Sequence, residues 1–550
     1  GSAPLSEPES GLAIKILDLL ARTPSDLGAE PGYAIITGLL FYLLGPENSL
    51  ARLAPALLGG VVVCLPYFYR TILGRKAALL LALGLALDPG LVALSRQASG
   101  AMIGVSFLLL ALTAGLAGRP VLTGAFIGLS LISGPVGVLG FLGMGLAVLI
   151  GRFAKISLPE PEPTHEDVSE SRWSPVQLGL LSMGGTLLLV GTLFMVYPSG
   201  LGAIAGVIPG TINRLVTSAG ISVGWQGFAL LIYQPLVVVF GLIGGILAWA
   251  RRDDLGRFLT IWFLIALLLA VIPPGRQVWF LAWPLIPLLA LAAKTLGPEF
   301  VWDRETRLVS AGLAALIVIL LAFIWLQFAS IARVEQASQT RILLILGIFL
   351  ITGVSTGLIA FGWSWEVARR GLVWGLFLAV GLYSLSLSMR MLSPDAPRAQ
   401  ELWYGQPTVV EEELLLKSLG DISEWSTGRR ESVDISVTHD LPSLRWALRK
   451  YPMATFGAQP GSGSMPSTLI TTLFEEPSQA AAYRGADYLW LSALAWEGAA
   501  PPDILRWMVF RESPTRNEHI IFWARNDLFP GGLIDPAADL PLEPDPEQVP

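Results

Sequence analysis

Residues 73–100 read LGRKAALLLALGLALDPGLVALSRQASG, and this stretch sets the pattern of most of the chain. Its apolar part, residues 77–94, is bounded by Arg75 and Lys76 on one side and by Arg96 on the other. In a helix, an apolar run of about 18 residues at about 1.5 Å per residue crosses most of a hydrocarbon core that is about 30 Å thick. The stretch therefore predicts a membrane-spanning helix with basic residues at both ends.

The composition of the whole chain agrees with this interpretation. Of its 550 residues, 53% are hydrophobic and only 14% are charged, and the mean hydropathy is +0.62. Soluble globular proteins carry about 25% charged residues, so the composition predicts a polytopic α-helical membrane protein. The net charge of −6 provides no basic surface, and we expect no nucleic acid partner. The single cysteine, Cys64, and three scattered histidines predict neither a disulfide framework nor a metal site built from thiolates or imidazoles.

Apolar stretches that can span a membrane recur along the chain. We count twelve: 51–69, 77–94, 101–117, 120–134, 135–151, 176–197, 226–250, 257–273, 277–294, 308–331, 341–362 and 371–389. Two apolar segments before them are too short to span. We expect residues 10–22 to form an amphipathic helix in the membrane interface and residues 33–44 to be re-entrant or interfacial. The expected fold is a bundle of about twelve transmembrane helices, preceded by interfacial helices on the outer face.

The lysines and arginines predict the orientation of this bundle, because loops rich in them face the cytoplasm. The richer loops hold Arg70, Arg75, Lys76, Arg119, Arg152, Lys155, Arg251, Arg252, Arg257, Lys294, Arg304, Arg307, Arg369 and Arg370. The alternate loops hold only Arg96, Arg214, Arg276, Arg333 and Arg341. Residues 1–50 and everything after Arg390 are therefore expected outside the cytoplasm, in a multi-pass protein of the plasma membrane.

The composition divides the chain into four parts. Residues 1–50 predict an outer-face loop with interfacial helices, and residues 51–390 predict the transmembrane domain, in which the acidic, proline-rich residues 156–174 predict a disordered cytoplasmic loop. Short β-rich runs alternate with helical patterns in residues 395–535, which predict an extracytoplasmic α/β domain. Residues 536–550 predict a flexible acidic tail. The β-rich runs are 431–439, 467–474, 486–491 and 518–525, and the helical patterns are 441–451 and 501–511.

A short acidic segment, PLSEPESGLA (4–13), precedes the apolar part of the chain and offers the first candidate for chemistry. Its Glu7 and Glu9 form a carboxylate pair that we expect at the outer face of the bundle. Such carboxylates can act as a general base that activates an acceptor hydroxyl, or they can ligate a divalent cation, so the cofactor stays open. The alternative is that both are solvated charges near a terminus.

Three arginines in the less basic loops are candidates for substrate binding. Arg96 and Arg276 each lie at the outer end of an apolar run, and a guanidinium group suits bidentate binding of phosphate. Arg214, in the predicted outer loop 198–225, is a third anion contact of the same kind. The alternative is that these arginines extend to the lipid headgroups and bind no substrate.

Two further residues near these arginines can contact a substrate. Trp279 follows the helix-breaking Pro273-Pro274-Gly275 and can stack on a sugar or an isoprenoid chain. It is also in the position of an ordinary aromatic-belt residue. Gln234 opens an apolar run, where its polar side chain can face a cavity.

Several stretches together resemble a known family. They are PLSEPESGLA (4–13), EPGYAIITGLLFYLLGPENSLARLAPALLGG (30–60), LGRKAALLLALGLALDPGLVALSRQASG (73–100) and PPGRQVWFLAWPLIPLLALAAKTL (273–296). The sequence resembles the membrane glycosyltransferases of the GT-C type, in the group of the protein O-mannosyltransferases and aminoarabinose transferases. Within this group it resembles more closely the bacterial and archaeal relatives described as flippase-activity-associated or oligosaccharyltransferase-like proteins. The resemblance covers about residues 4–390 and extends more weakly into the C-terminal domain.

The resemblance implies inverting transfer of a sugar from a polyprenyl phosphate donor to an acceptor on the outer face of the membrane. It implies that Glu9 is the base that activates the acceptor, with Glu7 assisting. It also implies that Arg96, which corresponds to the arginine of the family's Ser-Arg motif, holds the donor phosphate together with Arg276. The lipid tail of the donor is expected in a cavity under the outer loops.

Three features depart from the family pattern. Pro8 stands where the family has the aspartate of its Asp-Glu pair, and no acid stands near Gly100–Ala101, a few residues after Arg96. The family's first transmembrane helix would precede Pro4. These departures keep a second function open, in which the chain is a catalytically silent scaffold or a subunit of a larger membrane complex with partner chains.

Overall fold

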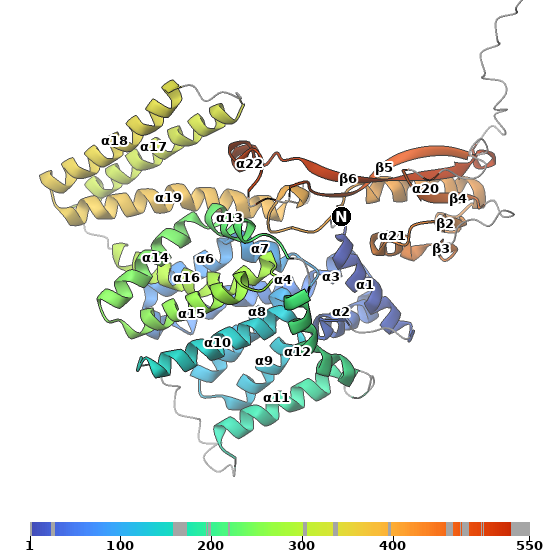
Figure 1. The fold of residues 1–550 in the computed structure, drawn as a ribbon, viewed down its shortest axis with the longest axis horizontal. Helices are drawn as coiled ribbons and strands as arrows, with labels where there is room; N and C mark the ends of the chain where they lie inside the picture. Colours follow the sequence, from blue (N-terminus) through green and yellow to red (C-terminus); the bar gives the residue numbers. More distant parts are fainter. Residues whose placement is uncertain are drawn as a thin grey trace, which may run out of the picture. The chain divides into compact units, whose positions relative to one another are not determined.

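A computed structural model shows the chain as two compact units (Figure 1). The helical unit comprises residues 1–3, 15–405 and 495–514, and the sheet unit comprises residues 4–14, 406–494 and 515–550. The structure describes residues 3–23, 28–157, 173–193, 195, 200–217, 220–300, 305–333, 339–393, 398–457, 466–473, 475, 483–496, 498 and 500–529. The predicted tail and most of the predicted loop 156–174 lie outside these described residues.

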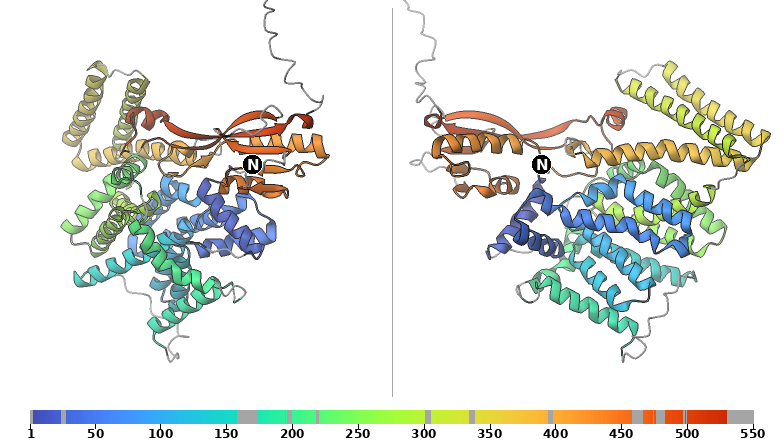
Figure 2. Two further views of the ribbon diagram at one scale, coloured as in Figure 1. Left: turned by 45° about the vertical axis from the view of Figure 1, so that its right-hand side comes forward. Right: turned by 180° about the vertical axis from the view of Figure 1, so that it is seen from behind.

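The helical unit is built almost entirely of helices. They are α2 (Pro31–Leu44), α3 (Asn48–Ala51), α4 (Leu53–Cys64), α5 (Arg70–Leu73), α6 (Arg75–Leu87), α7 (Pro89–Ser95), α8 (Ala101–Leu116), α9 (Pro120–Ile132), α10 (Pro135–Phe153), α11 (Pro175–Gly191), α12 (Gly200–Thr217), α13 (Val223–Tyr233), α14 (Pro235–Ala250), α15 (Asp254–Val271), α16 (Ala282–Leu296), α17 (Arg307–Arg333), α18 (Gln339–Gly362), α19 (Trp365–Leu392) and α22 (Ile504–Phe510). The first helix, α1 (Glu7–Leu20), is divided between the two units. Figures 1 and 2 show α17 and α18 side by side, and both helices contact α19.

Six of the described helices are long and apolar enough to cross a membrane. They are α10, α15, α17, α18, α19 and the helix Val278–Glu299, which contains α16. Two further pairs qualify as broken spans, α6 with α7 bent by 57° and α13 with α14 bent by 96°, which makes up to eight. The polytopic helical fold is confirmed, and each of the twelve predicted stretches contains helix. The count of twelve spans is not confirmed, because α4, α8, α9 and α11 are shorter apolar helices.

Both breaks have the same cause in the sequence, a proline that opens the second helix of the pair. Pro89 is the first residue of α7, and Pro235 is the first residue of α14. A residue before proline avoids helical backbone angles, while proline suits the first position of a helix. Asp88 adds a cap to α7, since its Oδ1 accepts a hydrogen bond of 2.8 Å from the Leu91 backbone amide. Two runs that read as single spans in the sequence therefore bend at these prolines.

One segment departs from its prediction. Most of the predicted outer loop 198–225 is the 18-residue helix α12, which places Arg214 in a last helical turn. The segment is rich in glycine and contains Pro209, so its own sequence favours a loop. Packing against α2, α9, α10 and α11 stabilises it as a helix instead.

The sheet unit contains a six-stranded sheet in the order β1-β5-β6-β4-β2-β3. β1, β5, β6 and β4 pair antiparallel, whereas β2 pairs parallel with both β4 and β3. The helices α20 and α21 and the central strands share a core that includes Leu415, Leu444 and Trp490. The predicted C-terminal sheet domain is therefore confirmed. The elements are β1 (Thr408–Val409), α20 (Glu412–Thr427), β2 (Ile435–Val437), α21 (Pro442–Ala447), β3 (Ala454–Phe456), β4 (Thr468–Thr472), β5 (Tyr483–Leu494) and β6 (Thr515–Arg525).

Residues 495–514, which connect β5 to β6, belong to the helical unit. Their helix α22 buries Trp507 completely, and the Trp507 indole donates to the Gln400 backbone oxygen at 2.9 Å. The helical pattern 501–511 is therefore a helix, as the sequence predicts, but its contacts are with the helical unit and not with the sheet.

A buried ionic cluster holds this segment. Glu401 is 1% exposed, accepts a hydrogen bond from Arg390 Nε at 2.8 Å, and lies 3.9 Å from Arg511 Nε. The hydroxyl of Tyr233 donates to the other carboxylate oxygen of Glu401. The guanidinium of Arg511 also stacks 4.2 Å from the centroid of the Trp507 ring. Two cations and one hydroxyl thus compensate a single buried carboxylate, which we call the Glu401 cluster.

Candidate functional site

Three segments of the helical unit meet around the carboxylate of Glu30. The Gly100 backbone amide donates to Glu30 Oε2 at 2.7 Å. A Cβ atom at Gly134, whose φ is 112°, would lie 2.8 Å from the Glu30 side chain, and one at Gly100 would lie 2.0 Å from the Ser133 backbone oxygen. Only glycine therefore permits this close approach. We call Glu30, Gly100, Ser133 and Gly134 the Glu30 cluster.

The Glu30 cluster extends to Arg214 on α12. Burial raises the pKa of the Glu30 carboxyl above its usual range. The hydrogen bond from Gly100 and the positive charge of Arg214 act in the opposite direction and offset part of this effect. Glu30 is thus a partly buried carboxyl with a nearby cation, Arg214, which is one of the residues that the sequence singles out.

The raised pKa of Glu30 predicts a pH-dependent stability. A glutamate in an unfolded chain has a pKa of about 4.3. When folding raises the pKa of a carboxyl, the protonated carboxyl stabilises the folded state at pH values below the unfolded pKa. This stabilisation is lost as the pH rises through the pKa of the folded state. Glutamine cannot ionise. As the pH rises from about 4 to about 8, we therefore expect the free energy of unfolding to fall less in Glu30→Gln than in the parent. Thermal unfolding in detergent across this range measures the difference. Parallel curves for the two proteins would contradict the prediction.

The loop that carries Arg276 is joined to the segment after α12 by backbone hydrogen bonds. The amide of Gly220 donates to Pro274 O at 3.0 Å, and the amide of Ile221 donates to Arg276 O at 3.2 Å. A Cβ atom at Gly220 would lie 2.4 Å from Arg276 O, so the two segments touch. The amide of Gly275 also donates to Leu215 O at 2.8 Å, so the loop that carries Arg276 contacts the last turn of α12, which carries Arg214.

Arg96 and Arg276 each have a buried Nε atom, a feature that they share with Arg257, Arg370 and Arg398 among the described residues. Among the described residues, the Nε atoms of both arginines have no hydrogen-bond partner. Arg276 is held in place by Nη1, which donates to Pro273 O at 3.1 Å. Arg96 ends α7, in the turn that leads to Gly100 of the Glu30 cluster. A buried N–H group without an acceptor in the protein can bind the oxygen of an anionic ligand.

Gln234 lies at the break between α13 and α14 and is 1% exposed. Its side-chain amide lies 3.4 Å from Asp88 Oδ1, so the breaks of the two bent helix pairs meet. Both residues line a cavity of about 80 Å³. Trp279 lies in the short 3₁₀ turn Val278–Leu281, half-buried, with its ring edge-to-face against Phe280. Trp279 therefore keeps part of its ring surface accessible.

Glu7 and Glu9 lie in the sheet unit, in the first turn of α1. Glu9 is 8% exposed, and its Oε2 accepts a hydrogen bond of 2.8 Å from the Ser6 amide, so it caps its own helix. Glu7 Oε2 accepts a hydrogen bond of 3.2 Å from the Ser443 amide. Burial raises the pKa of Glu7 although this hydrogen bond opposes the shift. Both carboxylates are thus held by the fold.

The residues that the sequence singles out therefore fall into two groups. The sheet unit holds Glu7 and Glu9, and the helical unit holds Arg96, Arg214, Gln234, Arg276 and Trp279. Sequence reasoning missed Glu30 and Asp88. Each is an acidic residue directly before a proline that opens an apolar helix, and this pattern is the signal that identifies them. No group of three or more histidine, cysteine, aspartate and glutamate side chains within the described residues is arranged to hold a metal ion. The divalent cation stays a prediction.

Comparisons with known proteins find similar solved structures but no similar sequence. No protein-family model matches the sequence, and no curated protein is significantly similar to it. ArnT from Cupriavidus metallidurans bound to undecaprenyl phosphate superposes with a TM-score of 0.50 at 14% identity, covering 94% of each chain. The apo state of the same ArnT gives a TM-score of 0.53 at 14% identity, covering 96% of this chain and 95% of that chain.

A third solved structure is more distant. The apo oligosaccharyltransferase of Archaeoglobus fulgidus gives a TM-score of 0.37 at 12% identity, covering 84% of this chain and 61% of that chain. The likeness to ArnT extends over nearly the whole length of both chains. The resemblance predicted from the sequence is therefore confirmed in the structure, and the chain has the fold of ArnT, an aminoarabinose transferase of the GT-C type.

Proposed function

We propose that the chain is a membrane glycosyltransferase that moves a sugar from a polyprenyl phosphate donor to an acceptor outside the cytoplasm. The observation that carries this proposal is the likeness, over 94% of both chains, to an ArnT that is bound to undecaprenyl phosphate. The apolar helices are consistent with a lipid-linked donor, which must reach the site from the bilayer.

In this proposal Arg96 and Arg276 hold the donor phosphate. The support is the buried, unpartnered Nε of each arginine, since a charge-assisted hydrogen bond to phosphate is stronger where water is excluded. Arg214 contributes further positive charge from α12. Trp279 offers a ring face to the sugar or the isoprenoid, and Gln234 lines the cavity beside the break at Asp88.

Glu9, with Glu7 assisting, is the proposed base. The carboxylate takes the proton from the acceptor hydroxyl while the acceptor oxygen forms a bond to the anomeric carbon of the sugar. The bond from the anomeric carbon to the phosphate oxygen breaks on the opposite face, which inverts the configuration. Polyprenyl phosphate then leaves with the negative charge, and the guanidinium groups of Arg96 and Arg276 stabilise that charge.

Binding of the donor lipid tests the phosphate site. We expect Arg96→Ala and Arg276→Ala each to weaken the binding of polyprenyl phosphate about 10- to 100-fold, because a hydrogen bond to a charged group contributes about 1.5–3 kcal/mol. Arg152→Ala is the matched control, since Arg152 is exposed in the last turn of α10, outside the proposed site. Titration of the detergent-solubilised chain with polyprenyl phosphate measures all three. If both site variants bind as well as the parent, the phosphate site is assigned to the wrong residues.

Turnover tests the enzymatic activity itself. The chain, reconstituted in liposomes with a crude pool of polyprenyl phosphate sugars, is expected to release polyprenyl phosphate and to form a glycosylated acceptor. The alternative function, a silent scaffold or subunit, is favoured by the departures from the family pattern at Pro8 and Ala101. Native mass spectrometry of gently solubilised protein separates the two: a bound sugar lipid supports the enzyme, whereas a stoichiometric partner chain without turnover supports the scaffold.

A further inference from the structure

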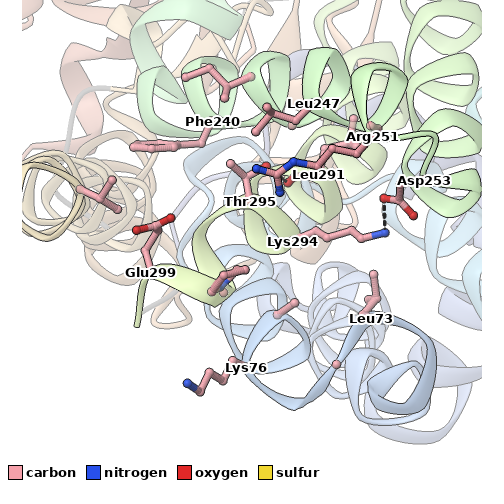
Figure 3. A pocket seen from close by; sticks show the side chains of 18 of the residues that line it. Leu73, Lys76, Phe240, Leu247, Arg251, Asp253, Leu291, Lys294, Thr295 and Glu299 are labelled. Atoms are coloured by element: carbon pink, nitrogen blue, oxygen red, sulfur yellow. Dashed lines mark hydrogen bonds and ion pairs between the residues drawn. The ribbon is translucent and has the colours of Figure 1, made fainter. Parts of the chain in front are cut away.

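A large groove lies in the helical unit (Figure 3), and neither Asp88 nor Gln234 lines it. Its volume is about 790 Å³. Its charged end is lined by the start of α6 and by Arg251 and Lys294 at the ends of α14 and α16. Glu299 lies on the other side of the groove, near Phe240 (Figure 3). Asp88 follows the other end of α6, which is about 20 Å long at about 1.5 Å per residue. The charged end of the groove is therefore about one helix length from the residues proposed to bind the donor.

The groove as a whole carries an excess of positive charge. Five cationic side chains and two carboxylates line the groove, which leaves a net charge of +3: Arg75, Lys76, Arg251, Lys294 and Arg369 against Asp253 and Glu299. Figure 3 shows Lys294 joined to Asp253, and Arg369 Nη2 lies 3.1 Å from Glu299 Oε1. In the part of the chain that the structure describes, the side chains of Arg75 and Arg251 make no hydrogen bond or ion pair. These two charges are thus available to an anion.

The start of α6 also favours a negative charge. A helix carries a partial positive charge at its N-terminus, so the cations Arg75 and Lys76 in the first turn of α6 are unfavourable there on their own. No side chain caps this end of α6, because its N-cap residue is Gly74. An anion beside the first turn would compensate the cations and accept hydrogen bonds from the uncapped amides.

The rest of the groove is apolar and follows the helices. α14 lines it from Val239 to Arg251, about 18 Å along the helix axis at about 1.5 Å per residue. The facing wall is formed by Leu372 and Leu376 of α19. Val239 and Ile243 are exposed at its edge, where an apolar surface of a membrane helix meets lipid. A free phosphate would bind only at the charged end, whereas the long apolar wall fits a hydrocarbon chain.

We propose that this groove binds one anionic phospholipid of the bilayer, with its phosphate at the charged end and an acyl chain along α14 and α19. Basic pockets between transmembrane helices bind anionic headgroups in this way. The distribution of lysine and arginine predicts that the charged end faces the cytoplasm, so the lipid belongs to the inner leaflet. The site goes beyond the proposed function and does not depend on it, because its ligand is neither the donor nor the acceptor.

A lipid titration tests the site. The full chain in detergent is titrated separately with phosphatidylglycerol, phosphatidylcholine, inorganic phosphate and polyprenyl phosphate, and native mass spectrometry counts the bound molecules. We expect one phosphatidylglycerol to bind, with little retention of phosphatidylcholine or inorganic phosphate. The double variant Arg75→Ala/Arg251→Ala should bind phosphatidylglycerol at least about tenfold more weakly, because two charge-assisted contacts to the phosphate are lost.

Two matched variants make the test specific. Arg119→Ala/Arg152→Ala removes the same charge from exposed positions on the same predicted face but outside the groove, and should change the affinity by no more than about twofold. Leu372→Trp keeps every charge and narrows the apolar wall, so it should also weaken phosphatidylglycerol binding. Equal losses in both double variants would show general surface attraction and overturn the proposal. Binding of inorganic phosphate, or of polyprenyl phosphate in preference to phosphatidylglycerol, would overturn it as well.

Discussion

Replacing Glu9 with glutamine is expected to lower the rate of sugar transfer by about 10²–10⁴-fold, the usual effect of removing a general base. Glutamine keeps a side-chain oxygen that can accept the hydrogen bond from the Ser6 amide, so the cap of α1 is preserved. It cannot take a proton from the acceptor. The measurement is the initial rate of transfer from polyprenyl phosphate sugars by the reconstituted parent and variant.

Two comparison variants identify the base. Glu7→Gln removes a carboxylate that contacts the Ser443 amide, and we expect a smaller loss of rate than for Glu9→Gln. Glu30→Gln changes a carboxylate of the helical unit that the sequence does not single out, and should leave the rate nearly unchanged. A loss confined to Glu30→Gln would move the base to the Glu30 cluster and refute the role of Glu9. Unchanged rates in all three variants would mean that none of these carboxylates acts as the base.

Replacing Glu401 with alanine is expected to lower the free energy of unfolding by about 3–5 kcal/mol, the effect of removing one partner from a buried ionic group. Arg390 and Arg511 would be left beside each other without a negative charge, and the Tyr233 hydroxyl would lose its acceptor. Thermal unfolding in detergent measures the loss. Limited proteolysis is the second readout, because residues 495–514 are held by this cluster and should become sensitive to cleavage.

A surface ion pair provides the control for Glu401. Glu366 Oε2 lies 3.6 Å from Arg370 Nη2, but the Glu366 side chain is 69% exposed. Solvent screens such a pair, so Glu366→Ala should cost less than about 1 kcal/mol. A loss at Glu401 no larger than that at Glu366 would mean that Arg390 and Arg511 find other partners, and that the Glu401 cluster does not anchor the segment.

The positions of the helices follow from the sequence because an apolar run of sufficient length has few alternatives to a helix in a membrane. Whether each helix is continuous or broken cannot be predicted from the apolar runs. Hydropathy averages over the Asp88-Pro89 and Gln234-Pro235 pairs, yet the proline alone decides where the second helix starts. For α12 the tertiary contacts override a segment whose own composition favours a loop.

The candidate site is harder to predict for a different reason. Glu30 accepts from Gly100, 70 positions away, and Glu401 meets Arg511, 110 positions away. Neither pair has a spacing that a helix or a strand would impose, so no periodicity reveals it. Arg96 and Arg276 can be found because a charge at the end of an apolar run is conspicuous. Which nitrogen atoms of these arginines are buried without a partner is visible only in three dimensions.

Each of the two units is built from segments that are far apart in the sequence. A single cut in the chain therefore cannot separate the units for expression. A fragment that begins at residue 406 would lack residues 4–14 of the sheet unit. It would also carry Trp507 and Arg511 without Gln400 and Glu401, so that a large indole and a cation would face solvent. Such surfaces promote aggregation. Leu494 and Thr515, however, are already cross-strand partners in the sheet. A soluble version of the sheet unit therefore calls for excising residues 495–514 and closing β5 onto β6 with a two-residue turn of the Asn-Gly kind.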